Sequence, residues 1–287
     1  MKNPIEKSLT ELVISRIKAE NPRNQEILTK MVRHLHAFIE DVEPTEEEWR
    51  TAVDFLTRTG QTCDDKRQEF ILFSDVLGVS MLVDAINHRS ASDSTETTVT
   101  GPFHALAPVY ELGDTIARGS EAERGEPTVV SGRVLDSNGQ PLKFATLDIW
   151  QSDDMGYYDV QDANQPEMNL RGVFKTNEAG EFWFRTIKPA AYPIPTDGPV
   201  GELLRASGRH AMRPAHIHFW IKAQGYKDLI THLFVAGDTY LDSDAVFGVK
   251  ESLILDFEKN TSAVDASKWK VSTPFYHVHF DFKLESK

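Results

Sequence analysis

Three pairs of histidines in this sequence have one residue between them, and histidine is a common metal ligand in proteins. The pairs are His34 with His36, His216 with His218, and His277 with His279. On a helix, residues two apart point about 200° apart around the axis, because each residue turns by about 100°. On a strand, residues two apart share a face. A strand pair can therefore share one ion, whereas a helical pair cannot.

The first pair lies in a helical pattern, because the apolar residues of NQEILTKMVRHLHAFIEDV recur every three or four positions. We therefore expect His34 and His36 to lie on a solvated helix face. Downstream, Thr45 and Glu48 form a capping-box pattern ahead of another helix. The run FILFSDVLGVSMLVDAIN predicts a further apolar helix over Phe70–Asn87, in which Gly78 is the weak point.

From Thr128 onward, the spacing of apolar residues changes from three or four positions to two, as in β-strands. The runs TVVSGRVLDSNGQPLKFATLDIW and GVFKTNEAGEFWFRTIKP each read as a hairpin, around Asn138-Gly139 and around Glu178-Ala179-Gly180. Three more strands are predicted in AHIHFWIKA, DLITHLFVA and FYHVHFDFKL, and a long loop rich in Pro and Gly covers Pro189–Arg213. Short strands with regular turns predict a β-sandwich. The expected class is α+β, with a helical domain at 1–100 and a sandwich domain at 101–287.

Composition narrows the function classes. The 287 residues carry a net charge of -13, which argues against non-specific binding to nucleic acid and against attraction to anionic membranes. The one cysteine, Cys63, cannot form an internal disulfide or a cysteine-rich zinc site. No apolar run approaches the roughly 18 residues of a membrane span. The charged N-terminus has no signal-peptide core, so we expect a cytoplasmic protein.

The two strand pairs remain open on geometry alone, since either pair could cap a sheet face and bond to the backbone. Arg213 and the long loop favour His216 and His218 as ligands, whereas His277 and His279 have no such neighbourhood and are predicted to be structural. Paired tyrosines follow the second strand in DDMGYYDVQ, and Tyr192 lies in the loop segment KPAAYPIPTDGP. Aromatic packing is the commoner use of such tyrosines. Two phenolates with two imidazoles, however, would suit the hard ion Fe(III).

Four segments, GYYDVQ, KPAAYPIP, GRHAMRPAHIHFW and THLFVAGDTYLDSDAVFGVK, resemble the intradiol ring-cleaving dioxygenases in order and spacing. The resemblance covers about residues 100 to 285, and the helical half is similar to the dimerising linker domain of that family. GPFHALAP resembles the substrate-cavity segment. RPAHIHFW, YDVQ and DSDAVFGV together are most similar to members that act on hydroxyquinol (1,2,4-benzenetriol).

The resemblance implies roles for individual residues. The ferric ligands would be Tyr158, Tyr192, His216 and His218. Tyr158, and not Tyr157, falls on the position of the family ligand, two residues after Gly156. Only one of the two can be a ligand, because neighbours on a strand end face opposite ways. Tyr192 would also act as a base once it is displaced from the metal. The substrate cavity would be lined by Leu72, Asp75, Val99, Gly101, Pro102, Phe103, Ile194, Pro195, Arg213 and Val246.

Three of the polar residues have alternative interpretations. Asp75 would bond to the third hydroxyl of a benzenetriol, or it would lie on a solvated helix face. Arg213 would stabilise negative charge on the activated ring, or it would form a surface ion pair. His232 stands where many catechol-cleaving relatives have Gln, and it would polarise the substrate or fill the sheet face.

The implied reaction is cleavage of hydroxyquinol by O₂ to 3-hydroxy-cis,cis-muconate, the enol form of maleylacetate, in aromatic catabolism. One alternative is a catechol or chlorocatechol 1,2-dioxygenase. The other, from a different class, is a β-sandwich carrier that binds an aromatic ligand without chemistry. The resemblance also implies a homodimer with a phospholipid in an apolar tunnel at its interface.

Overall fold

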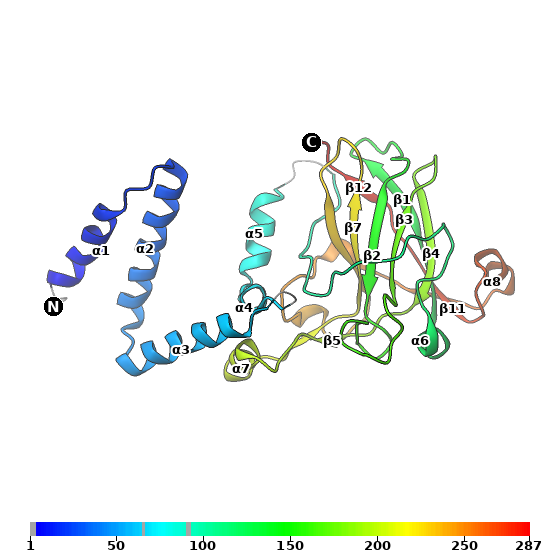
Figure 1. Cartoon of the computed structure of the whole chain (residues 1–287). Helices are drawn as coiled ribbons and strands as arrows, with labels where there is room; N and C mark the ends of the chain where they lie inside the picture. The colour runs from blue at the N-terminus through cyan, green and yellow to red at the C-terminus, as the bar shows by residue number, and fades with distance from the viewer. Residues whose placement is uncertain (1–3, 65–66, 90–92) are drawn as a thin grey trace. The chain divides into compact units, whose positions relative to one another are not determined.

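The computed structural model describes residues 4–64, 67–89 and 93–287 of the chain (Figure 1). Contacts divide the chain into two compact units, Met1–Arg58 and Thr59–Lys287. This division lies upstream of the predicted domain boundary at residue 100. The helices Glu69–Val76 and Val79–Asn87 belong to the same unit as the strands. Within the described residues, no helix has the length and apolar character of a membrane span.

The first helices follow the predicted pattern. They are α1 (Pro4–Arg16), α2 (Pro22–Val42) and α3 (Glu46–Thr62). The capping box before α3 is confirmed, because the Thr45 backbone N donates to Glu48 Oε2 at 2.7 Å and the Glu48 N donates to Thr45 Oγ1 at 3.2 Å. Both histidines of the first pair lie in α2, where His36 Nδ1 is 2.9 Å from Thr10 Oγ1.

The prediction of one helix over Phe70–Asn87 is wrong. Gly78 adopts φ +70°, which ends α4 (Glu69–Val76) and starts α5 (Val79–Asn87). The left-handed region favours glycine, so the residue that weakened the pattern is the one that turns the chain. The predicted loop Pro189–Arg213 also contains short elements, which are β5 (Tyr192–Pro193), α7 (Pro199–Ala206) and β6 (Met212–Arg213).

Over the described residues the strands form a sandwich of two five-stranded sheets and a small β5–β6 pair. The first sheet contains β1 (Pro127–Asp136), β4 (Glu181–Ile187), β10 (Glu258–Asn260), β11 (Phe275–His279) and β12 (Phe282–Leu284). The second has the order β3 (Arg171–Lys175), β2 (Thr146–Gln151), β7 (His216–Lys222), β8 (Leu229–Val235) and β9 (Ile254–Leu255). Short helices α6 (Gly119–Arg124), α8 (Ala263–Trp269), η1 (Leu241–Ser243) and η2 (Glu251–Leu253) lie in the connections.

Neither predicted hairpin forms. A turn does occur at Asn138-Gly139, but β1 pairs with β4, β11 and β12, whereas β2 pairs with β3 and β7. The chain therefore crosses from one sheet to the other at this turn, and it crosses again between β3 and β4. The run FYHVHFDFKL, predicted as one strand, is split into β11 and β12, and both pair in parallel with β1.

Alternate side chains of β7, in the second sheet, point to opposite faces, so the apolar core and the histidines lie on different sides of the sheet. Ile217, Phe219 and Ile221 of β7 point into the core between the sheets, with Phe174 and Phe184. Because side chains alternate along a strand, His216, His218 and Trp220 point to the opposite face. Both histidines are nevertheless buried, since a second apolar cluster that includes Leu72, Phe103 and Val246 covers that face. The sheet thus places polar side chains in a layer that water does not reach.

Candidate metal centre and substrate pocket

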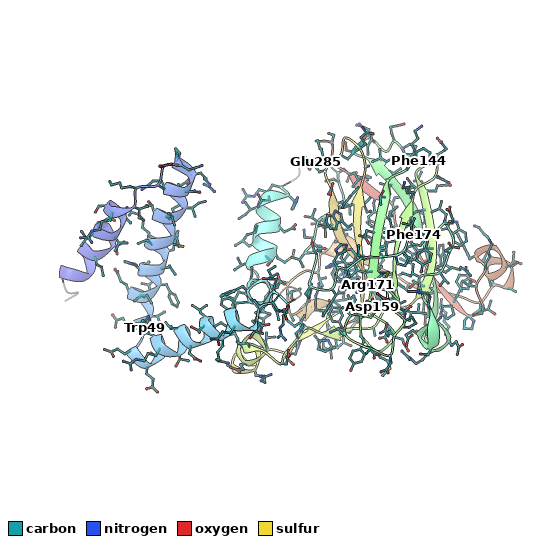
Figure 2. All side chains as sticks on the ribbon, in the orientation of Figure 1. Trp49, Phe144, Asp159, Arg171, Phe174 and Glu285 are labelled. Atoms are coloured by element: carbon teal, nitrogen blue, oxygen red, sulfur yellow. The ribbon has the colours of Figure 1, made fainter. Side chains whose placement is uncertain are left out.

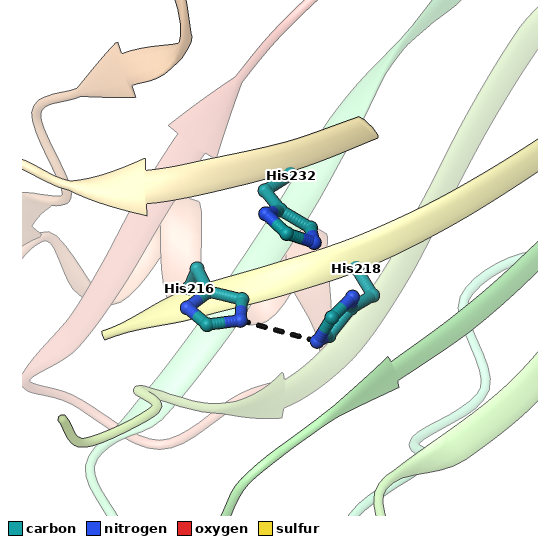
Figure 3. Close-up of side chains that lie close together, drawn as sticks. All are labelled: His216, His218 and His232. Atoms are coloured by element: carbon teal, nitrogen blue, oxygen red, sulfur yellow. Dashed lines mark hydrogen bonds between the residues drawn. The ribbon is translucent and has the colours of Figure 1, made fainter. Parts of the chain in front are cut away.

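Three buried histidines meet on the outer face of the second sheet (Figure 3). His216 and His218 come from β7, and His232 comes from β8, where it lies directly opposite His218 in the register. The Nε2 atoms of His216 and His218 are 3.1 Å apart. One ring nitrogen from each of the three histidines lies within 4.8 Å of the others, an arrangement that could hold a metal ion.

The two predicted tyrosine ligands reach the same point from different segments. Tyr158, in the turn that follows β2, has its hydroxyl 3.1 Å from His218 Nε2. Tyr192, in β5, lies with its ring centroid 5.1 Å from that of Tyr158. Both are buried, whereas Tyr157 is about half exposed (48%). The structure therefore directs Tyr158 inward and Tyr157 outward.

Gly156 explains how the two tyrosine segments approach so closely. It adopts φ +87°, and a Cβ at this position would lie 2.7 Å from the Ala191 carbonyl oxygen. Only a residue without a side chain fits such a conformation and such a contact. Glycine therefore lets the turn that carries Tyr158 lie against the strand that carries Tyr192.

The donor set fits a metal ion. His216 Nδ1 is 2.7 Å from the Pro214 carbonyl, to which it donates, so the lone pair of Nε2 faces His218 and Arg213. Burial lowers the pKa of His216 to about 3 and the pKa of His218 well below its usual range, so both rings are neutral at pH 7. Separations near 3 Å between donor atoms are what two ligands about 2.1 Å from one ion would have.

The tyrosines bear on the charge of such an ion. Burial, together with Tyr192, raises the pKa of Tyr158 well above its ordinary value, while the charges of Arg213 and Arg171 act in the other direction. A phenolate at this depth therefore requires a strong positive charge beside it, and a bound cation reverses the usual effect of burial. Two buried phenols with two neutral imidazoles thus suit a highly charged ion.

Arg213 joins the donor set to a buried carboxylate that the sequence interpretation did not single out. Its Nη1 lies 3.4 Å from the Tyr192 hydroxyl and 3.3 Å from His216 Nε2. Its Nε donates to Asp244 Oδ1 at 3.0 Å, and both side chains are only 2% exposed. Burial opposes both charges, but their attraction raises the pKa of Arg213 and lowers that of Asp244. The alternative of a surface ion pair is therefore wrong.

A cavity of about 1030 Å³ lies beside the donor set in the second unit. Six of the predicted substrate residues line it: Leu72, Asp75, Gly101, Pro102, Phe103 and Pro195. Val99, Ile194 and Val246 do not line it but pack in the apolar cluster that also contains Tyr158 and Tyr192. Arg213 lies behind the cavity wall, against Tyr192. Apolar residues such as Leu72 and Phe103 line it together with polar and charged residues, which include Asp75 and Arg67.

Asp75 is a buried acid of this cavity, as is Glu69, which forms an ion pair with Arg67. Its side chain is only 4% exposed, so the alternative of a solvated helix face is wrong. Burial raises the pKa of Asp75, although a hydrogen bond from Ser80 and the charge of Arg213 partly oppose this. A carboxylate accepts more than one hydrogen bond, so Asp75 could also accept one from the hydroxyl of a ligand in the cavity.

A second buried ion pair holds the cavity segment against the turn that carries Tyr158 (Figure 2). Arg171 Nε donates to Asp159 Oδ1 at 2.7 Å, and its Nη1 donates to the Phe103 carbonyl at 2.6 Å. The Phe103 ring in turn stacks on Tyr158, with centroids 4.6 Å apart. One guanidinium thus fixes two segments around a single tyrosine.

We expect Arg171→Met to destabilise the fold strongly. The substitution leaves Asp159 buried without its partner, and breaking such a pair costs about 3–5 kcal/mol. Urea denaturation measures the loss in free energy of unfolding. Arg133→Met, which breaks the exposed pair with Asp281, serves as the control and should change the unfolding midpoint little. Equal effects of the two substitutions would contradict the proposed anchoring by Arg171.

The third histidine pair lies in the other sheet. His277 and His279 of β11 both contact Ser131 of β1, whose Oγ is 2.9 Å from His277 Nε2 and 3.2 Å from His279 Nδ1. No further His, Cys, Asp or Glu completes a metal-binding group around them in the described part of the chain. Their place is consistent with the predicted structural role.

Comparisons with known proteins add to this geometry. A family model described as Dioxygenase matches residues 99–286, and one described as Catechol dioxygenase N terminus matches residues 21–95. A hydroxyquinol 1,2-dioxygenase of Rhizobium sp. (strain MTP-10005) is 51% identical over 98% of this chain and 95% of that protein. A 6-chlorohydroxyquinol 1,2-dioxygenase of Cupriavidus pinatubonensis is 52% identical over 96% of each. The solved hydroxyquinol 1,2-dioxygenase of Pseudomonas putida DLL-E4 has 48% identity and a TM-score of 0.92 over 99% of both chains.

Proposed function

Because this chain belongs to the intradiol ring-cleavage dioxygenase family, we propose that it cleaves hydroxyquinol with O₂. The bond between the two adjacent hydroxyl-bearing carbons breaks, both oxygen atoms enter the product, and the product is 3-hydroxy-cis,cis-muconate. The observation that carries this proposal is the convergence of Tyr158, Tyr192, His216 and His218 beside a cavity that contains Asp75. The names of the similar proteins support the choice of substrate.

We propose Fe(III) as the ion, held by His216, His218, Tyr158 and Tyr192. When bound there, ferric iron would supply an electron acceptor that prepares the diol ring for reaction with O₂. Two anionic oxygen donors favour a hard trivalent ion over zinc, which more often has three histidines or a carboxylate.

The chain supplies the acid–base and electrostatic parts of the reaction. The Tyr192 oxygen, next to Arg213, is placed to accept a proton from a substrate hydroxyl when it is present as the phenolate. The guanidinium of Arg213 is held by Asp244 and therefore stays charged inside a dry site. It can stabilise the negative charge that develops on the ring. The apolar walls around Phe103 and Leu72 exclude water from the reacting atoms.

Asp75 is the proposed determinant of selectivity. We expect Asp75→Ala to lower kcat/KM for hydroxyquinol by about 10–100-fold, because a hydrogen bond to a charged group contributes about 1.5–3 kcal/mol. Catechol lacks the third hydroxyl, so its kcat/KM should fall much less. Steady-state assays of both substrates give the ratio. An equal loss on the two substrates would show that Asp75 acts on the fold or on the metal.

Assembly is a separate proposal, that the helices of residues 1–100 join two copies of the chain. The apolar side chains of α2 are exposed within one chain: Ile27, Leu28, Met31, Leu35, Phe38, Ile39 and Val42. A continuous apolar stripe of this size usually marks an interaction surface. We propose that a second copy covers it, with a phospholipid acyl chain between the two.

Sedimentation and extraction test these two proposals separately. Sedimentation equilibrium should give the mass of two chains, and Leu35→Glu with Phe38→Glu should give the mass of one. A monomeric wild-type protein would contradict the dimer. Mass spectrometry of an organic extract of the dimer should detect a phospholipid, and a lipid-free dimer would contradict only the proposed acyl chain.

Steady-state rates on hydroxyquinol, catechol and chlorocatechol test the proposed substrate. Hydroxyquinol should have the highest kcat/KM. A clear preference for catechol would favour the alternative of a catechol 1,2-dioxygenase within the same family. Absence of visible absorption and of iron in the purified protein would contradict the proposed ion.

A further inference from the structure

The two proposed histidine ligands are oriented in different ways. A metal-binding histidine almost always donates its second ring N–H to a carbonyl, a carboxylate or a water. His216 follows this rule through the Pro214 carbonyl at 2.7 Å. The Nδ1 atom of His218 is buried and has no hydrogen-bond partner among the described residues. Among the described residues, ring contacts are what remains to hold the plane of the His218 ring.

The sheet itself provides such contacts. β7 lies between β2 and β8, and the register places Trp150 on one side of His218 and His232 on the other. The Trp150 ring stacks on the His218 ring with centroids 4.6 Å apart and planes 12° apart. The His232 ring contacts it edge-on, at 4.2 Å and 85°. Rings on both sides thus limit rotation of the His218 imidazole.

Further contacts fix these neighbours. The ring of His104 packs edge-on against Trp150, at 4.7 Å, and its Nε2 is 2.9 Å from Asp148 Oδ2. Packing against His104 and His218 positions the indole of Trp150. The backbone of Gly101 also lies near His218, because a Cβ there would be 3.4 Å from His218 Cε1.

We propose that Trp150 and His232 are positioning residues, and that together they orient His218 toward the metal by ring packing instead of a hydrogen bond. This inference rests on the proposed iron site, and it gives His232 a role other than polarising the substrate. Stacking of parallel rings contributes energy beyond the area it buries. A neighbour that keeps an aromatic face should therefore preserve the orientation, whereas an aliphatic neighbour of similar length should not.

The test compares three tryptophan variants of the iron-loaded protein. Trp150→Met removes the aromatic face, Trp150→Phe keeps one, and Trp220→Met removes a tryptophan that lies on the same face of β7 without a ring contact to His218. The readouts are the rate of iron release to desferrioxamine, the maximum of the visible absorption band, and thermal unfolding. We expect Trp150→Met to release iron about 10–100-fold faster than wild type, the cost of losing an outer partner of a metal ligand. Its absorption band should also shift.

The two other variants should stay close to wild type in both iron readouts. Equal release rates for Trp150→Met and wild type, or for Trp150→Met and Trp220→Met, would overturn the proposal. If Trp150→Met fails to fold, His232→Phe and His232→Leu decide the question. Phenylalanine keeps a ring without a nitrogen and should hold iron like wild type, whereas leucine removes the ring and should release iron faster; equal release by the two would overturn the proposal. A wild-type protein without iron would instead contradict the proposed function, so the two failures are distinguishable.

Discussion

His218→Ala is expected to yield a protein without its visible absorption band and without measurable ring cleavage. The substitution removes one of four donors, and it also leaves the Tyr158 hydroxyl without its partner at 3.1 Å. Loss of an outer partner alone costs about 10–100-fold in metal affinity, so the loss of a ligand should exceed about 100-fold. Iron content by atomic absorption and the visible spectrum after purification measure the effect.

His277→Gln is the matched control. It also removes a histidine from a strand-borne pair, but this pair contacts Ser131 in the other sheet. Glutamine can retain one bond to Ser131, so the variant should keep its iron, its colour and its activity. If His277→Gln loses iron and His218→Ala retains it, the metal is bound by His277 and His279, and our assignment to His216 and His218 is wrong.

Arg213→Met is expected to lower kcat by about 10²–10³-fold, the usual cost of removing one group that stabilises developing charge. Arg213 is 2% exposed and lies 3.4 Å from the Tyr192 hydroxyl, where little water can screen its charge. Stopped-flow turnover under saturating hydroxyquinol and O₂ measures the change. We expect the iron to remain bound, since the guanidinium is not a ligand.

The buried carboxylate beside Arg213 requires its own control. Arg213→Met leaves Asp244 buried without a counter-charge, which alone would destabilise the fold. Arg213→Met with Asp244→Asn removes both charges and should recover most of the lost stability without recovering kcat. Recovery of kcat in the double variant would show that the single substitution acts through the fold, and it would contradict a direct role for Arg213.

Local patterns predicted the helices and strands well but not their pairing. The capping box at Thr45 and Glu48 depends on neighbours in sequence, and it was confirmed. The signal at Asn138-Gly139 also describes a real local turn. Whether the following strand returns to the same sheet depends instead on contacts with residues far along the chain, such as those between β1 and β11. Period and turn type do not encode these contacts.

In the candidate site, too, local patterns predicted some features, and contacts between distant residues decided the others. Alternation along β7 predicted that His216 and His218 share a face, but it could not distinguish them from His277 and His279. Arg213 and the long loop favoured the first pair in the sequence, and the family resemblance assigned Tyr158 and Tyr192 to the same site. The fold brings both tyrosines to these histidines. Trp150 was missed because a tryptophan in a strand is usually a core residue. Asp244 could have been sought, since a buried arginine needs an acidic partner.

Oxygen labelling tests the central claim most directly. The purified, iron-loaded protein is given hydroxyquinol under ¹⁸O₂, and the product is analysed by mass spectrometry. The account predicts a ring-opened 3-hydroxymuconate with one labelled oxygen in each of the two new carboxylates, because the bond between the two hydroxyl-bearing carbons breaks and both atoms of O₂ are incorporated. An intact ring, or a product with only one labelled oxygen, would contradict it.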